Sequence, residues 1–167
     1  MGQIGNTKVM LHQYFNSKWT DDLHGMSTGG KLELFSMLIE EFGVPDYIGI
    51  IKSSTHRRAM TRMRVSAHKL PIETGRYYKI SRECRECPLG CKTIGDEVHY
   101  MTSCNHPFIK EIIDPVMSKL SNLCETFDQM DPKTKTIFML ANKDRRVLPI
   151  VAKFCYKLEE QFKDMTF

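Results

Sequence analysis

The sequence contains no long apolar run. No stretch reaches the roughly 20 consecutive apolar residues that a membrane-spanning helix needs. The first residues, MGQIGNTKVM, lack a basic segment followed by an apolar one, so we expect no secretory signal peptide. Asn6 also stands where a myristoylation motif has Ser or Thr. We therefore expect an intracellular protein, in the nucleus or the cytoplasm and without a membrane partner, whose thiols stay reduced.

The sequence also lacks the motifs of the common enzyme classes. The glycines of STGG (residues 27–30) do not make a phosphate-binding loop motif. The acidic pair in WTDD (residues 19–22) fits a polar turn before a helix, and Pro45-Asp46 has no carboxylate and lysine partner at a spacing typical of nucleases. No internal repeat or low-complexity tract is present. We expect a protein that is not an enzyme.

Composition and charge indicate one small domain with a basic segment. The chain has 167 residues, of which 41% are hydrophobic and 26% charged, so its core is modest and a structural metal would help to hold it. The net charge is +4, but residues 52–92 hold eleven Lys or Arg against three Asp or Glu. This segment therefore carries +8 on a remainder of −4, which suggests an electrostatic footprint for a polyanion.

Hydrophobic periodicity predicts a mostly α fold. We expect a loosely ordered N-terminal arm over residues 1–30 and a small helical domain over residues 31–165. Within the domain the spacing of apolar residues predicts helices over 31–42, over 54–67 and from about Arg146 into the 160s.

Proline and glycine positions refine this expectation. Asp131-Pro132 is a helix start signal, with the aspartate as N-cap and the proline in the first turn. Pro115 is expected to break or kink the helix that begins near Ile109. The stretch ETGRYYKI (residues 73–80) is predicted to form a turn followed by a short extended piece.

Cysteine and histidine cluster within residues 82–106. Cys84, Cys87, His99 and Cys104 have the spacing C-x2-C-x11-H-x4-C. Zinc takes four nitrogen or sulfur ligands, and a cysteine pair two residues apart supplies half of such a shell. The sequence therefore predicts a Zn2+ site in an inserted zinc-knuckle-like module. A closed set of four ligands favours a structural site over a hydrolytic one.

Two neighbouring residues leave this ligand set open. Cys91 can take the place of His99 or Cys87, and His106 can take the place of Cys104. With Cys84 in the set, a Cys91→Ser variant is expected to keep the metal.

Other interpretations of the cysteines remain. A redox pair at Cys84 and Cys87 would need a βαβ context that is missing here, and the cysteines can also be small core residues. Cys124 and Cys155 lie within apolar stripes, which indicates packed thiols rather than ligands.

The basic segment supplies candidate contacts to nucleic acid. In the predicted helix over 54–67, Arg57 and Arg64 project from one side and Arg58 and Arg62 from the other. The predicted phosphate contacts are Arg57, Arg58, Arg62, Arg64, Lys69, Arg76, Lys79, Arg82 and Arg85.

Other residues near the cysteines have predicted roles. Tyr77 and Tyr78 are candidates for stacking on unpaired bases, with half-buried packing as the alternative. Arg82 and Arg85 are also expected to offset the negative charge of the thiolates, and Glu97 to accept an N–H from the ligating imidazole, with a solvated carboxylate as the alternative.

The central segment resembles a known pattern. It has an Arg-x-Arg helix, H-x-L-x-I-E-x-G-R, R-x-C-x-x-C, D-E-x-H and a final cysteine. The matching residues are Arg62, Arg64, His68, Leu70, Ile72, Glu73, Gly75, Arg76, Arg82, Cys84, Cys87, Asp96, Glu97, His99 and Cys104. The pattern is similar to a zinc-binding C-terminal segment of invertebrate retroelement open reading frames, of a non-LTR-like type, downstream of the reverse transcriptase. The likeness covers residues 31–163, and Cys91 is a thiol that the pattern does not contain.

The resemblance implies a fragment or a domesticated relic of such a protein. Regions of this kind are thought to help grip nucleic acid, so the expected function is that of a zinc-stabilised, non-catalytic module that contacts RNA or DNA through the backbone. The second hypothesis is a zinc-stabilised helical interaction or scaffold module without nucleic acid. In that case the apolar faces over 32–42 and 148–162 could be docking surfaces for a protein partner rather than one core.

Overall fold

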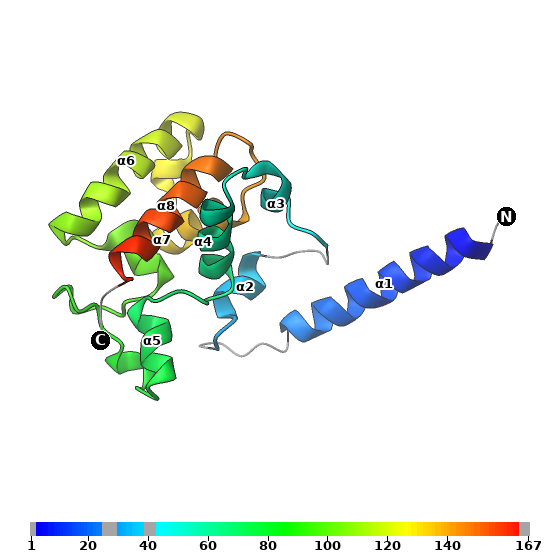
Figure 1. Ribbon diagram of the computed structural model, residues 1–167, viewed down its shortest axis with the longest axis horizontal. Helices are drawn as coiled ribbons and strands as arrows, with labels where there is room; N and C mark the ends of the chain where they lie inside the picture. Colours follow the sequence, from blue (N-terminus) through cyan, green and yellow to red (C-terminus); the bar gives the residue numbers. More distant parts are fainter. Residues whose placement is uncertain (1–2, 25–29, 39–42, 164–167) are drawn as a thin grey trace.

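A computed structural model describes residues 3–24, 30–38 and 43–163 of the chain. Its helices are α1 (Gln3–His24), α2 (Glu33–Leu38), α3 (Tyr47–Ile50), α4 (Ser54–Arg64), α5 (Pro71–Tyr77), α6 (Pro107–Leu123), α7 (Pro132–Ala141) and α8 (Leu148–Gln161). Helices α4, α6, α7 and α8 gather into one body, whereas α1 projects away from it (Figure 1). The fold is mostly α, as predicted, and the described residues contain a single isolated β-bridge.

The core forms around α8, which packs against α4, α6 and α7. Its apolar stripe includes Val151, Phe154 and Leu158, all essentially without exposure. The predicted stripe over 148–162 is therefore core and does not form a free docking surface. At the end of this stripe, the Phe162 ring lies 4.6 Å from that of Tyr100, which ties α8 to the cysteine-rich module.

Local sequence signals set where several helices begin. The side chain of Ser53 accepts a hydrogen bond from the His56 amide at the start of α4. Asp131 caps α7 by accepting from the amides of Lys133 and Thr134, as the sequence predicted. These caps satisfy backbone N–H groups that have no partner within the helix.

The sequence predicted a break or a kink at Pro115, and the structure shows that α6 is not broken there but continues to Leu123. A proline inside a helix removes one hydrogen bond and crowds the preceding turn. Pro115 lies on the exposed side of α6, whereas Ile112, Ile113 and Val116 are buried. The carbonyl that loses its partner therefore faces solvent, while the apolar face of α6 stays packed on the core.

Residues 3–24 of the predicted arm and the segment over 73–80 also differ from their predictions. Residues 3–24, expected in a loosely ordered arm, form the long helix α1. The periodicity did not indicate it because its apolar residues do not line one face. The stretch predicted as a turn and an extended piece belongs largely to α5, which Pro71 begins. The predicted helix over 31–42 is observed as α2, and residues 39–42 lie outside the described residues.

None of the helices within the described ranges combines the length and the apolar character needed to cross a membrane.

Candidate metal centre

Three cysteines and one histidine converge beside α6. Their ligand atoms, from Cys87, Cys91, His99 and Cys104, all lie within 4.8 Å of one another. Cys87, His99 and Cys104 are buried, and Cys91 is half-buried. Three sulfur atoms and one imidazole nitrogen in such a small volume make a donor set typical of a structural metal site.

A short hairpin brings Cys87 and Cys91 together. Glu86 and Ile94 form an antiparallel bridge, and the Cys87 amide donates to the Thr93 carbonyl at 2.7 Å. Between the two arms, Gly90 has φ +86°, a conformation that glycine adopts without strain. The turn therefore folds the chain back so that both thiols reach the same side.

A single π-helical turn over His99–Ser103 places the other two ligands. The Cys104 amide donates to the His99 carbonyl at 2.8 Å, five residues back, so the two side chains lie on the same side of the widened turn. The carboxylate of Asp96 accepts from the His99 amide at 2.9 Å and fixes the start of the turn.

The surroundings of the cluster orient its donor atoms. Thr93 Oγ1 lies 3.1 Å from His99 Nδ1, whereas His99 Nε2 is buried without a hydrogen-bond partner. An unpaired buried nitrogen is costly, and a metal ion at Nε2 would satisfy it. The Tyr100 hydroxyl donates to Cys87 Sγ at 3.1 Å, an interaction that a thiolate accepts well.

The electrostatics of the cluster favour a bound cation. Burial, together with the neighbouring thiols, raises the pKa of Cys104 to about 12. Burial also lowers the pKa of His99, although Asp96 opposes this shift. The imidazole is therefore neutral near pH 7, which is the form that binds metals. The Cys104 thiol, in contrast, needs a cation beside it to lose its proton near pH 7.

The cluster differs from the first predicted ligand set at one position. The structure brings together Cys87, His99 and Cys104, but Cys91 takes the place of Cys84, which is exposed and outside the cluster. The reason is local, because Cys84 ends a short 3-10 turn and precedes the hairpin that folds the chain back. The imidazole of His106, the other spare residue, is not part of the cluster either.

A signal for Cys91 was present in the sequence. Pro88, Leu89 and Gly90 separate it from Cys87, and a Pro-x-Gly sequence favours a tight turn. A C-x3-C spacing around such a turn serves as well as C-x2-C. The two-residue spacing of Cys84 and Cys87 favoured that pair, whereas the Pro-x-Gly turn brings Cys91 to Cys87 instead.

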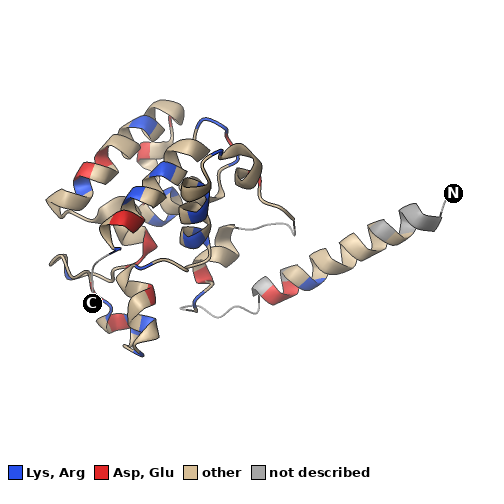
Figure 2. Cartoon of the chain, in the orientation of Figure 1, with Lys and Arg blue, Asp and Glu red and all other residues tan. Residues whose placement is uncertain are grey.

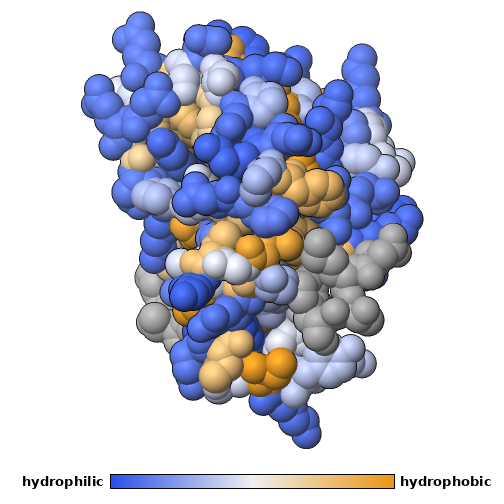
Figure 3. Space-filling view, turned by 90° about the vertical axis from the view of Figure 1, so that its left-hand side faces the viewer, coloured by the Kyte–Doolittle hydropathy of each residue, from blue (hydrophilic) through white to orange (hydrophobic). Residues whose placement is uncertain are grey.

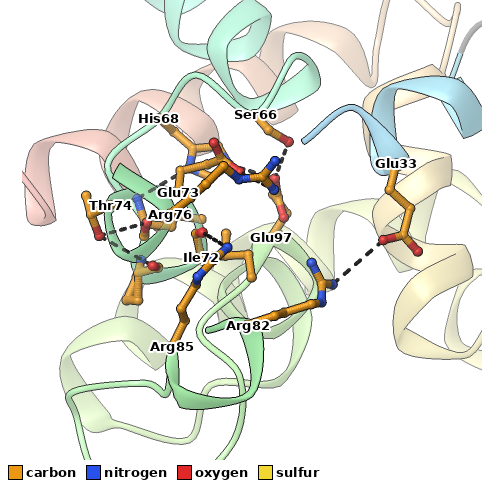
Figure 4. A network of polar contacts seen from close by, with 12 residues as sticks. Glu33, Ser66, His68, Ile72, Glu73, Thr74, Arg76, Arg82, Arg85 and Glu97 are labelled. Atoms are coloured by element: carbon orange, nitrogen blue, oxygen red, sulfur yellow. Dashed lines mark hydrogen bonds and ion pairs between the residues drawn. The ribbon is translucent and has the colours of Figure 1, made fainter. Parts of the chain in front are cut away.

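A second polar cluster lies next to the metal centre and is shown in Figure 4. Glu97, expected to accept from the ligating His99, instead accepts from Ser66 at 2.6 Å and pairs with His68 at 2.8 Å. Although burial alone would raise it, the hydrogen bonds from His68 and Ser66 lower the pKa of Glu97. Glu97 therefore joins the segment after α4 to the turn that carries His99. The side chain beside the His99 imidazole is that of Thr93 and not that of Glu97.

Arg82 and Arg85 have partners of their own inside the protein. Arg82 lies 3.8 Å from Glu33 of α2, and Arg85 donates to the carbonyls of Ile80 and Ile72 at 2.7–3.0 Å (Figure 4). Arg85 thus fastens the hairpin to α5. Neither guanidinium has a hydrogen bond to the sulfur cluster among the described contacts.

Four of the other predicted phosphate contacts also have partners inside the protein. Arg57 donates to the Ile51 carbonyl at 2.8 Å. Arg64 is buried, donates to the Leu140 carbonyl and stacks on Tyr47. The remaining two pairs are Lys69 with the Lys163 carbonyl and Arg76 with Glu73.

The remaining candidates face solvent. Arg58 and Lys79 are exposed, and Arg62 is exposed while pairing with Glu159 at 3.5 Å. On α4, Arg58 and Arg62 are thus exposed, whereas Arg57 and Arg64 donate to carbonyls of the protein. Tyr77 and Tyr78 are 86% and 62% exposed, so the alternative of half-buried packing is wrong.

The chain matches no protein-family model, and comparisons with curated proteins and with solved structures give no match either.

Proposed function

We propose that the chain is a zinc-stabilised, non-catalytic module that binds nucleic acid. The observation that carries the zinc assignment is the cluster of three thiols and one imidazole. Two sulfurs bound to one tetrahedral zinc at about 2.3 Å lie about 3.8 Å apart. The Cys91 and Cys104 sulfurs are 3.7 Å apart, which agrees with this separation. Soft thiolate ligands also favour zinc over magnesium or calcium.

The nucleic-acid part of the proposal is supported by charge. Residues 52–92 carry +8, and within this segment Arg85 joins the hairpin to α5. Arg58, Arg62 and Lys79 remain at the surface. Lys79 directly follows Tyr77 and Tyr78, whose rings are exposed. Exposed cations contact phosphates and aromatic rings stack on unpaired bases.

The experiment is a titration of the zinc-loaded full chain with single- and double-stranded RNA and DNA at two salt concentrations. Metal analysis should first give one zinc per chain. Binding should then weaken steeply with salt, because each phosphate contact releases counterions. Reversal of Arg58 and Lys79 to Glu should weaken binding, whereas Arg57 and Arg64 are unsuitable because they hold the fold. Absence of binding at low salt would overturn the proposal.

The proposed relation to retroelement proteins rests on the sequence pattern from Arg62 to Cys104. Its H-x-L-x-I-E-x-G-R part corresponds to residues with structural roles here, since His68 pairs with Glu97 and Glu73 with Arg76. Its R-x-C-x-x-C part includes Cys84, which lies outside the metal cluster. Under this relation, Cys84 is a position at which the chain keeps the residue of the pattern but does not use it in the metal cluster.

The second candidate function, a protein-interaction module, is favoured by one observation. Helix α1 projects from the body and exposes apolar side chains. Val9, Met10, Leu11 and Tyr14 are each more than half exposed. Helix surfaces of this kind commonly bind a partner helix or a second copy. The side of the molecule shown in Figure 3 is mostly hydrophilic, with apolar side chains gathered across its middle and near its lower end.

This candidate has its own test. Sedimentation velocity of the full chain and of a chain lacking residues 1–24 should show concentration-dependent association only for the first. Replacing Val9, Met10 and Leu11 by Gln should have the same effect as the deletion. If the full chain is monomeric at all concentrations, self-association through α1 is excluded.

A further inference from the structure

Helices α4 and α8 lie side by side and present one continuous surface. Their side chains meet at two points, where the His56 ring lies 5.2 Å from that of Tyr156 and Arg62 pairs with Glu159. Residue numbers rise in the same direction along both helices at these contacts. The two helices therefore run in the same general direction, and their outer faces border each other.

The outer faces of both helices are basic. On α4 the exposed cations are Arg58 and Arg62, and on α8 they are Lys153 and Lys157. Figure 2 shows basic residues on the two helices next to one another on the face turned to the viewer. Arg58, Lys153 and Lys157 form no ion pair with any residue that the structure describes, so their charge is available to a ligand.

These two lysines lie outside the basic segment, 61 and 65 residues beyond its last residue, Lys92. The charge of residues 52–92 gave no indication of them, because α8 lies in the part of the chain that is acidic overall. Packing of the buried faces of α4 and α8 is what brings the four cations onto one surface.

We infer that the α4–α8 surface, made of Arg58, Arg62, Lys153 and Lys157, is the phosphate-binding surface for the nucleic-acid backbone. The inference rests on the proposed nucleic-acid function and assigns it to a place. The ligand class follows from charge complementarity, since four cations on two adjacent helices match a chain of phosphates. The hairpin that holds Cys87 and Cys91 then has a structural role.

Carboxylates limit the extent of this surface. Glu159 neutralises part of the charge of Arg62, and Glu160 is exposed one residue further along α8. A phosphate backbone is therefore repelled at the C-terminal end of α8. The contact is expected to centre on Arg58, Lys153 and Lys157.

The test uses the zinc-loaded full chain and fluorescently labelled RNA and DNA oligonucleotides, single-stranded and duplex. One variant carries Lys153→Glu and Lys157→Glu. The matched control carries Lys110→Glu and Lys119→Glu, which changes the same net charge on exposed positions of α6. Zinc content and circular dichroism establish that both variants fold. A Lys153→Gln, Lys157→Gln variant replaces the first if charge reversal prevents folding.

Loss of two phosphate contacts should weaken binding about tenfold or more at low salt and reduce the slope of log K against log salt by about 2. The α6 control should change the slope by less than half of that amount. If the wild type binds and the α8 variant behaves like the control, the inference is overturned and the proposed function stands. If the wild type does not bind any of the oligonucleotides at low salt, the proposed function fails, and the surface assignment with it.

Discussion

Cys84 and Cys91 are similar in sequence context but differ in position. Each belongs to a cysteine pair with Cys87, yet only Cys91 reaches the cluster. Cys91→Ser should therefore lose zinc, while Cys84→Ser should keep it, the reverse of what a C-x2-C site requires. Metal analysis after gel filtration, with titration by a zinc indicator, measures both.

Two further outcomes sharpen this comparison. Cys87→Ser should lose zinc under either ligand set, so it serves as the positive control. Retention of one tightly bound zinc by Cys91→Ser would show that Cys84 completes the shell.

The carboxyl of Glu73 should make the free energy of unfolding depend on pH, with a defined sign. Burial raises the pKa of this carboxyl, although Arg76 lies 3.1 Å away and acts in the opposite direction. A carboxyl with a raised pKa holds its proton more tightly in the folded state, so its stabilising contribution is present at acid pH and is lost as pH rises through the folded pKa. Relative to Glu73→Gln, the wild type should lose free energy of unfolding as pH increases from about 4 towards neutrality.

Urea unfolding of the wild type and of Glu73→Gln at a series of pH values provides the measurement. Both proteins carry the same metal centre, so the effect of acid on zinc cancels in the difference. A difference that stays constant or grows in favour of the wild type with rising pH contradicts the assignment.

At the scale of single residues, the chemical type of the site was more predictable from the sequence than the contacts that its residues make. The residues 82–106 were identified as a metal module from cysteine and histidine alone, and three of the first four candidates meet in the cluster. The partner of Glu97 was not predictable, because His68 lies 29 residues earlier and reaches it only through the fold. Long-range polar contacts of this kind leave no local pattern.

At the scale of elements, α5 and the hairpin meet through one close contact. A Cβ atom built on Gly75 would lie 2.6 Å from Cγ and 2.9 Å from Cδ of Arg85, whose guanidinium is fixed by carbonyls. Gly75→Ala should therefore destabilise the protein by about 1–3 kcal/mol, as overpacking does. Chemical denaturation of the zinc-loaded protein gives the value.

The matched background is Arg85→Ala, which removes the obstructing side chain. There, Gly75→Ala should instead stabilise by up to about 1 kcal/mol, since alanine has the higher helix propensity. Equal effects of Gly75→Ala in both backgrounds would exclude the contact as the reason for glycine.

Helices with a clear apolar stripe or a clear cap were predictable, whereas short helices and those without a stripe were not. Helices α4 and α8 have apolar residues at helical spacing, and these residues are buried. Asp131, as N-cap, indicates the start of α7. Helix α5 has seven residues, too few for a periodic signal, and its tyrosines suggested an extended piece. Their exposure shows that they do not pack as a strand would require.

At the scale of the whole molecule, the cysteine-rich module meets the helical core where Tyr100 lies against Phe162 and where the turn His99–Ser103 packs on α6 and α7. Removal of zinc by a strong chelator should therefore unfold residues 82–106 first and weaken the contact with α8. Hydrogen exchange followed by mass spectrometry should show loss of protection over this range, with smaller changes in α6 and α7.

Reconstitution distinguishes this from irreversible damage. Addition of one equivalent of zinc should restore the protection, whereas magnesium should not. Unchanged exchange over 82–106 after complete metal removal would show that the module folds without an ion.

The closeness of the four ligands in sequence has a consequence for how the chain folds. All of them lie between Cys87 and Cys104, so the loops that close around the ion are short and lose little chain entropy. The contacts of α4 with α8, in contrast, join residues nearly a hundred positions apart. We therefore expect the proposed zinc to bind before the helices have packed, so that the metal-bound segment with Tyr100 offers α8 a preformed surface.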